Sequence, residues 1–362
     1  MIKYCLCASV LSFATVSNAT ASSLSSEYFI EIESFSSSPT MPIKQLKDNL
    51  KGPAATQGDY ILSSSRVETG LRTKLFTVSI LERMEFYAEF TNDTAQIFQE
   101  QRNDVDSART RAYDVDLYGF FFKASGAKLQ LPLIRSKEFG LSMAGTYYEA
   151  SKMQQGVLKG TVYTVEDIQG YLALDYSYTS DVFFSREPES EVNGYGYSVD
   201  VEGWWAPSEH TRVMFFAKDL HSNVRWRNQQ HTEASATTDT VRYNGDGRIE
   251  ARPAIEWFES ERSVTQKLPR YYEISVARNL NDQWALGAIV ERYESTTILT
   301  LEAIHKLTES QSIAVNVSPS HNALGVHYHS RYLFLGVSSD RFYWDKVRNF
   351  NLSFGVNVPI QF

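Results

Sequence analysis

The last thirteen residues, Phe350 to Phe362, constrain the fold of this 362-residue chain more than any other segment. Every second residue is apolar, and the residues between them are small or polar. Successive side chains of a β-strand point to opposite faces, so this pattern predicts a strand with one apolar and one polar face. The segment carries no charge and is long enough to cross a bilayer, which takes about 9–11 tilted strand residues. The sequence therefore predicts a membrane-crossing strand at the carboxyl end.

The amino terminus has the pattern of a secretory signal peptide. A short basic start with Lys3 precedes a mostly apolar stretch, and small residues follow at the positions that signal peptidase cleaves. We expect cleavage after Ala21, with Ala19 as the alternative, so that residues 22–362 form one mature domain. Cys5 and Cys7 are the only cysteines, and both lie in the signal. The mature chain therefore has no disulfide and no thiolate metal ligand.

The mature chain shows the same alternation along most of its length. Residues 77–90 are the clearest example, because only Glu82 interrupts their apolar face. The mean hydropathy is −0.32, although 43% of the residues are hydrophobic. A barrel with apolar outward and polar inward positions accounts for both values. We predict an all-β fold, a transmembrane antiparallel β-barrel of about 14 strands, with 12 to 16 as the range. Weak strands at residues 156–165 and 224–228 leave that number open.

The terminal strand, with its aromatic last residue, resembles the final strand of Gram-negative outer-membrane β-barrel proteins, and no narrower family is identified. The resemblance implies an integral protein of the cell outer membrane, in contact with its lipid. It also implies that periplasmic chaperones and the barrel-assembly machinery handle the chain during biogenesis. The residues that match the assembly signal are Phe354, Val356, Val358, Ile360 and Phe362.

A periplasmic carboxyl terminus assigns the last loops to the two sides of the membrane. It places residues 318–322 and 340–348 outside, and residues 307–310 and 329–331 in the periplasm. Residues 42–50 have helical spacing. They predict either a small plug of the barrel or a helix in a loop.

Charged residues recur at positions expected to face the barrel lumen. In particular, Arg225 and Arg227 flank Trp226, which predicts one outward aromatic side chain between two inward cations. Such charges either line a water-filled pore and set its selectivity, or fill the lumen with salt bridges; the sequence leaves both readings open. The pore-lining candidates are Arg83, Glu85, Asp114, Asp116, Asp200, Glu202, Arg225, Arg227, Arg248, Glu250 and Arg252.

We therefore expect a porin-like channel for small hydrophilic solutes. The alternatives are a closed structural or assembly barrel, accessory to export of a polymer or surface appendage, and a barrel hydrolase. A net charge of −8 argues against a nucleic-acid partner. The sequence does not indicate an oligomeric state.

The hydrolase alternative depends on histidines near the carboxyl end. His321, His327 and His329, with Ser320 and Ser330, provide residue types used in nucleophilic catalysis. However, His329 and Ser330 are expected at the periplasmic rim, no motif of a known barrel hydrolase is present, and no third metal ligand accompanies His327 and His329. We expect no enzymatic activity, no catalytic residue, no metal and no cofactor.

Overall fold

The computed structural model describes residues 26–360 except 56, 104–110, 165–167, 181–192, 239–240, 244, 247–248, 252–253 and 295. The predicted signal peptide and Phe362 lie outside the described residues. Among the described residues, no helix is long and apolar enough to cross a membrane.

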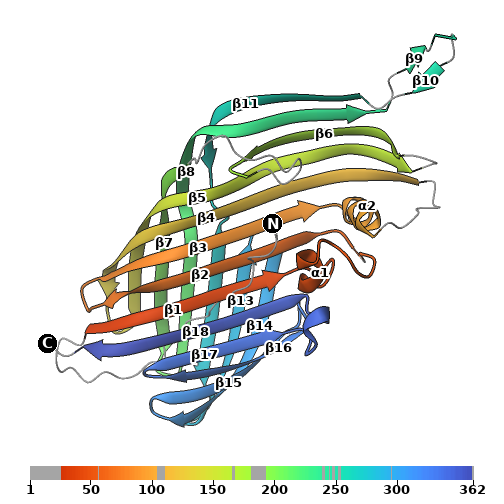
Figure 1. Cartoon of the computed structure of the whole chain (residues 1–362). Helices are drawn as coiled ribbons and strands as arrows, with labels where there is room; N and C mark the ends of the chain where they lie inside the picture. Colours follow the sequence, from red (N-terminus) through yellow and green to blue (C-terminus); the bar gives the residue numbers. More distant parts are fainter. Residues whose placement is uncertain are drawn as a thin grey trace.

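Fourteen antiparallel strands form a closed barrel (Figure 1), which confirms the predicted fold class. The ring closes where β1 pairs with β18, from Ser26 opposite Ile360 to Ser37 opposite Asn349. Its strands, in the order of the ring, are β1 (Ser26–Ser37), β2 (Tyr60–Arg72), β3 (Thr77–Phe90), β4 (Arg111–Arg135), β5 (Phe139–Thr164), β7 (Gly194–Ser208), β8 (Thr211–Thr237), β12 (Tyr271–Asn279), β13 (Trp284–Tyr293), β14 (Thr296–Thr308), β15 (Gln311–Ser318), β16 (Ala323–Ser330), β17 (Leu333–Ser339) and β18 (Asn349–Ile360).

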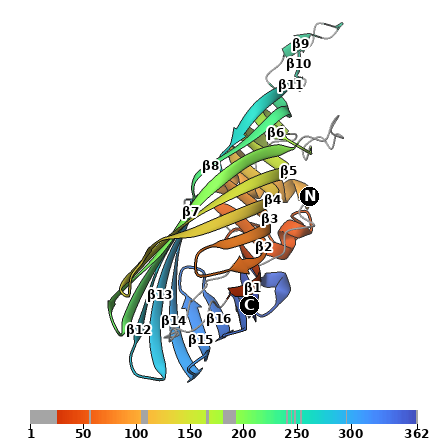
Figure 2. The same cartoon turned by 90° about the vertical axis from the view of Figure 1, so that its left-hand side faces the viewer.

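Three strands continue well beyond the barrel. β4, β5 and β8 have 25, 26 and 27 residues, whereas β1 and β18 have 12 each. Past the end of β7, strand β6 (Ile168–Tyr178) lies between β5 and β8, and β11 (Ala254–Gln266) pairs with the other edge of β8. We call β6, β11 and the adjoining parts of β4, β5 and β8 the extension. It rises from one side of the barrel, with the hairpin of β9 (Val241–Tyr243) and β10 (Ile249–Ala251) at its tip (Figure 2).

The extension explains the uncertain strand number. Residues 156–164 belong to β5 and residues 224–228 belong to β8, so the two weak strands of the sequence are continuations of long strands. Residues 156–164 pair with β6 outside the ring. Residues 224–226 pair with β7 on one edge and with β11 on the other, so neither segment adds a strand to the ring.

The two ends of the barrel differ. The short turns, Ser26 and Ile360 lie at one end, and α1 (Ile43–Lys47), α2 (Asn92–Arg102) and η2 (Trp344–Lys346) lie at the other (Figure 1). The barrel end that contains Ile360 also contains residues 307–310 and 329–331, and the opposite end contains residues 318–322 and 340–348. The expected alternation of the loops between the two ends is confirmed. We call the end with the helices the external end.

Helix α1 belongs to the loop between β1 and β2 at the external end. The Ile43 amide donates to the Val347 carbonyl oxygen at 2.8 Å. Met41 and Leu46 pack on Ala55 and on Ala95 of α2. The helical spacing of residues 42–50 therefore corresponds to a loop helix at the rim of the barrel.

The outer and inner faces of the barrel have opposite chemistry. Large apolar side chains remain exposed on the outside, including Val78, Ile80, Leu129, Ile274, Val290, Leu301, Val315, Val326, Leu335 and Val337. The alternate positions on the same strands are buried and mostly polar, including Ser79, Arg83, Ser275, Glu302, Ser312 and Asn316. Hydrocarbon suits the first face, and the second face encloses a polar lumen.

Candidate functional site

A cluster of charged side chains spans the middle of the lumen. Arg83 of β3 is 2% exposed and forms two hydrogen bonds to Asp219 of β8, Nη1 to Oδ1 at 2.9 Å and Nη2 to Oδ2 at 2.6 Å. Arg83 Nε also donates to Glu85 Oε1 at 2.8 Å. β4, β5 and β7 separate β3 from β8 in the ring, so the pair of Arg83 and Asp219 crosses the interior.

Glu85 extends this cluster to the far wall. Lys218 Nζ donates to Glu85 Oε1 at 3.0 Å, and the Tyr293 hydroxyl donates to Glu85 Oε2 at 2.7 Å. Tyr293 lies on β13, which is six strands from β3 in a ring of fourteen and therefore almost diametrically opposite. We call Arg83, Glu85, Lys218, Asp219 and Tyr293 the lumen bridge.

The position of Asp219 depends on an irregularity in β8. Val201 pairs with Ala217 and Val199 pairs with His221, so β8 has extra residues at this point. Asp219 adopts a φ of 57°, which aspartate tolerates better than most side chains. Its amide donates to Asp200 Oδ1 at 2.9 Å, which fixes the bulge that carries it.

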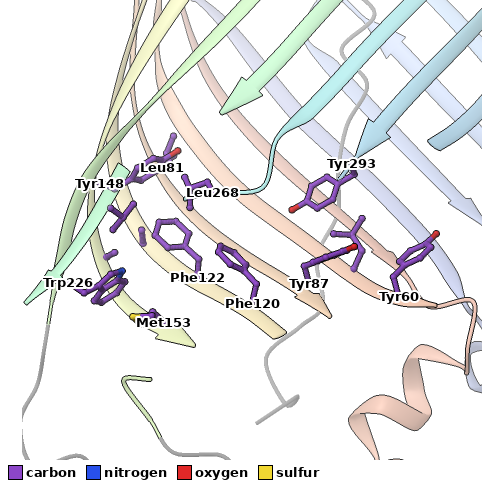
Figure 3. Close-up of a cluster of buried hydrophobic side chains, with 14 residues drawn as sticks. Tyr60, Leu81, Tyr87, Phe120, Phe122, Tyr148, Met153, Trp226, Leu268 and Tyr293 are labelled. Carbon is purple, nitrogen blue, oxygen red and sulfur yellow. The ribbon is translucent and has the colours of Figure 1, made fainter. Parts of the chain in front are cut away.

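An apolar layer lies beside the lumen bridge (Figure 3). Phe120 and Phe122 of β4 pack with Trp226 of β8 and with Leu268 from the loop between β11 and β12. The Leu268 amide donates to Ser222 Oγ at 2.9 Å, which holds this loop in the interior.

The prediction for Trp226 is therefore wrong. Trp226 is fully buried in the interior layer, and Arg225 and Arg227 are exposed. The reason is that aromatic side chains fill the interior at this height, so the large apolar residue points inward and the two arginines reach solvent.

The wall formed by β1 to β4 has paired charges. Arg66 lies 2.8 Å from Glu33 and 3.5 Å from Glu68. Glu68 also accepts from Ser79 Oγ at 2.6 Å and lies 3.7 Å from Lys128 Nζ. Each inward carboxylate in this group therefore has at least one cationic partner.

The wall formed by β12 to β14 has carboxylates without a cationic partner among the described residues. Glu273 lies directly opposite Glu291, and the Tyr271 hydroxyl lies 2.9 Å from Glu273 Oε2 and 2.7 Å from Glu291 Oε1. One hydroxyl hydrogen serves only one of them at a time. Glu302 on β14 is 3% exposed. None of Glu273, Glu291 and Glu302 forms an ion pair with a described Lys or Arg. We call these three residues the acidic strip.

Two cavities lie between the external end and this strip. The outer cavity has a volume of about 470 Å³ and is lined by Asp59, Thr297, Ser320, Asp340, Arg341 and Arg348, among others. The inner cavity, of about 30 Å³, is lined by Glu291, Thr300, Asn316 and Ser318, among others. His321 and Asn349 border both cavities.

A hydrogen-bonded ring lies where the two cavities meet. The Tyr60 hydroxyl is 3.1 Å from His321 Nε2 and 3.2 Å from Ser37 Oγ. Ser37 Oγ donates to Asn349 Oδ1 at 2.6 Å, and Asn349 Nδ2 donates to the His321 carbonyl oxygen at 3.3 Å. Burial lowers the pKa of His321, and Asp340 opposes that effect. We call these four residues the polar ring.

The remaining pore-lining candidates occupy several environments. Asp200 is buried against Asp219, and Glu202 accepts from Gln130 Nε2 at 3.0 Å. Asp114 and Asp116 lie in the extension beside α2, where their amides donate to Asp93 and Thr94. Glu250 lies on β10, and Arg248 and Arg252 are outside the described residues.

Among the described residues, His327 and Ser330 have other partners than each other. His327 Nε2 lies 2.9 Å from Asn316 Nδ2, and Ser330 Oγ accepts from the Leu333 amide at 3.0 Å. Among the described residues, no serine hydroxyl bonds to His327 or His329. That this protein is not an enzyme stays a prediction.

Sequence reasoning missed Lys218, Asp219, Tyr293 and the acidic strip. The alternation signal was available for Glu291 and Tyr293, which share one face of β13. No such signal existed for Asp219, because its inward position depends on the bulge.

A closed fourteen-stranded antiparallel barrel with an apolar outer face and a charged lumen defines an outer-membrane β-barrel protein.

No protein-family profile and no curated protein matches this chain. Among solved structures, it is similar to the toluene transporter TodX of P. putida, with 8% identity over 94% of this chain and 91% of that chain and a TM-score of 0.41. A Pseudomonas aeruginosa FadL homologue has 11% identity over 92% and 88% of the two chains and a TM-score of 0.39. The Ralstonia pickettii toluene transporter TbuX has 9% identity over 94% and 90% and a TM-score of 0.33. Similarity this low bears on neither substrate nor mechanism.

Proposed function

We propose that this barrel is an outer-membrane channel for small hydrophilic solutes and that the lumen bridge closes it in the present conformation. The observation that carries the proposal is the succession of two cavities, one at the external end and a second one that Glu291 of the acidic strip borders.

The outer cavity is the first binding place for a solute. Its volume of about 470 Å³ falls within the range of about 300–1,000 Å³ that is common for small-molecule sites. Carboxylates, guanidinium groups and hydroxyls line it, so it favours a polar solute over a hydrocarbon. The polar ring separates this cavity from the inner one, which Glu291 borders.

The acidic strip gives the channel a preference for cations. Carboxylates without cationic partners, on a wall shielded from bulk water, attract positive solutes and repel anions. Glu273 and Glu291 lie side by side, and Glu302 lies lower on the neighbouring strand.

Conduction requires the lumen bridge to open. Tyr293 reaches Glu85 through a single hydrogen bond, whereas Arg83 holds Asp219 through two. Separation of Tyr293 from Glu85 therefore breaks fewer hydrogen bonds across the lumen than separation of Arg83 from Asp219.

Planar bilayer recording tests the channel and its selectivity together. We expect ion conductance from the folded protein, with a reversal potential in a salt gradient that indicates cation preference. Replacing Glu291 and Glu302 by Gln should reduce that preference several-fold. Glu82→Gln is the control for each single replacement, because it removes one carboxylate from the outer face. A protein that never conducts at any voltage contradicts the channel.

A closed structural barrel is the second candidate, and the lumen bridge favours it. Tyr293→Phe discriminates between the two, because it deletes only the bond to Glu85. A gated channel should open more often in this variant, while Tyr272→Phe, on the exposed outer face, should behave as wild type. A closed barrel should give no current in either.

We also propose that the terminal strand carries the assembly signal. Phe354, Val356, Val358 and Ile360 form the apolar side of β18, and Phe362 follows the described residues. Deleting Phe362 should lower the amount of folded protein in the outer membrane, whereas Tyr332→Ser in a turn should not. Equal amounts in both would contradict the proposal.

A further inference from the structure

Four polar side chains meet on one face of the extension, the face that continues the inner side of the barrel wall through the pairs Ser177–Gln155 and Gln155–Phe120. Asp175 of β6 lies opposite Glu233 of β8, and Ser177 lies opposite His231. His231 Nε2 is 3.3 Å from Glu233 Oε1 and 3.7 Å from Asp175 Oδ1. On the other side of the ring, His231 Nδ1 is 2.9 Å from Ser177 Oγ.

We propose that Asp175, His231 and Glu233 form a binding site for a divalent transition-metal ion of the zinc type. One nitrogen and two carboxylate groups make a donor set that Zn²⁺ accepts. With bonds of about 2.0–2.1 Å, the ligand atoms of a tetrahedral ion lie about 3.3–3.4 Å apart. The distance of 3.3 Å matches this edge, and that of 3.7 Å needs only a small side-chain movement. One potential ligand atom from each of the three residues lies within 4.8 Å of the others.

Supporting partners of the ligands are already in place. Ser177 bonds to the ring nitrogen that would not bind the metal, and so fixes the orientation of the imidazole. Arg262 of β11 bonds to Glu233 Oε1, the oxygen that lies 3.3 Å from His231 Nε2. Metal-binding histidines and carboxylates commonly have such a second hydrogen-bond partner. The Arg262 charge offsets one of the two carboxylates, and a net negative charge remains for the cation.

Exposure of the ligands allows an ion to enter from solvent. The side chain of His231 is 4% exposed and is held by its neighbours, while those of Asp175 and Glu233 are 60% and 47% exposed. Three protein ligands leave a fourth position for water. Because β6 and β8 supply ligands from both strands, the bound ion links them across the extension.

The same residue types suggest a serine hydrolase, but the backbone opposes it. Ser177 pairs with Gln155 of β5 and with His231 of β8, so it lies in a central strand of the extension. Backbone amides there belong to the sheet ladder and are not free to stabilise an oxyanion. Ser177 is also buried, which restricts access of a substrate to its hydroxyl.

Zinc titration of the folded protein in detergent, purified without a histidine tag and stripped with EDTA, tests the site. We expect one Zn²⁺ per chain, measured by calorimetry and by competition with a chromogenic indicator. His231→Ala should weaken binding at least 100-fold. Ser177→Ala should weaken it about 10- to 100-fold, because it removes an outer partner of a ligand. His221→Ala, on the same strand, is the matched control and should bind as wild type.

X-ray absorption of the loaded protein should show one imidazole and otherwise oxygen ligands at about 2.0–2.1 Å. Unchanged binding by His231→Ala overturns the site, as does the absence of binding at 100-fold molar excess of Zn²⁺. Equal affinity for Ca²⁺ would also overturn it, because that indicates a carboxylate surface without a role for imidazole. Gel mobility without heating verifies that each variant is folded.

Discussion

Both walls of the lumen carry inward carboxylates on neighbouring strands. The two walls differ in whether these carboxylates have cationic partners. On the wall of β2 to β4, Glu68 and Glu85 are each held by cations and hydroxyl groups. On the wall of β12 to β14, no ion pair with a described residue reaches Glu273, Glu291 or Glu302. The same residue type therefore has two environments in one lumen.

In the proposed channel, this difference separates a structural role from a binding role. A buried ion pair contributes little net stability, but losing one partner is costly because the other charge stays buried. The first wall thus fixes side chains that cross the lumen. A carboxylate without a cation destabilises the fold, so the acidic strip is better explained by the solutes and water that it meets than by folding.

The largest expected effect comes from breaking the paired wall at Arg83. Arg83→Met keeps most of the side-chain volume and leaves Asp219 without its cation. We expect the free energy of unfolding to fall by about 3–5 kcal/mol. Denaturant unfolding in detergent, followed by gel mobility, measures this. The double variant Arg83→Met/Asp219→Asn should recover part of the loss; a loss below about 1 kcal/mol in the single variant would argue that the bridge is loosely held.

A smaller change in the free energy of unfolding is expected when one carboxylate of either wall is replaced by an amide, and its sign should differ between the two walls. Glu68 and Glu302 are both 3% exposed. Glu68→Gln should lower the free energy of unfolding by about 1–3 kcal/mol, because Arg66 and Lys128 lose their shared partner. Glu302→Gln should leave it unchanged or raise it by about 1 kcal/mol, because an unpaired charge disappears. Equal losses in the two variants would show that the walls do not differ.

The alternation of side chains was sufficient to predict the fold. Residues 77–90 place Arg83 and Glu85 inward and Val78 outward, as their order in the sequence indicates. The period-two rule works here because lipid and lumen impose opposite polarity on the two faces of each strand. It fails for Trp226, because the interior at that height is apolar.

The partners of these residues could not be predicted in the same way. Arg83 and Asp219 are 136 residues apart, and their contact depends on strand order, register and the bulge in β8. The ligands of the proposed metal site were missed for the same reason. Asp175 and Ser177 share a face, as do His231 and Glu233, but only the register of β6 against β8 brings the two pairs together.

The smallest expected effect concerns pH at the polar ring, above the acidic strip. Burial lowers the pKa of His321 below its ordinary value of about 6.5, so the unfolded chain binds more protons than the folded one between the two values. Stability should therefore fall as the pH drops below about 6.5, because protonated His321 is poorly accommodated in the ring. Burial raises the pKa of Asp59 at the outer cavity, and Glu89 adds to the shift. The stability linked to that carboxyl is present at low pH and is lost as the pH rises through the raised value, which partly opposes the His321 trend.

His321→Gln isolates the histidine contribution to this pH dependence. Glutamine can keep a hydrogen bond to Tyr60 but does not titrate, so the variant should lose the fall in stability below pH 6.5. Unfolding temperatures measured from pH 7.5 to pH 5 provide the comparison. His210→Gln, in the turn between β7 and β8 at the opposite end, should keep the wild-type slope. If both variants keep the fall in stability below pH 6.5, a group other than His321 causes it.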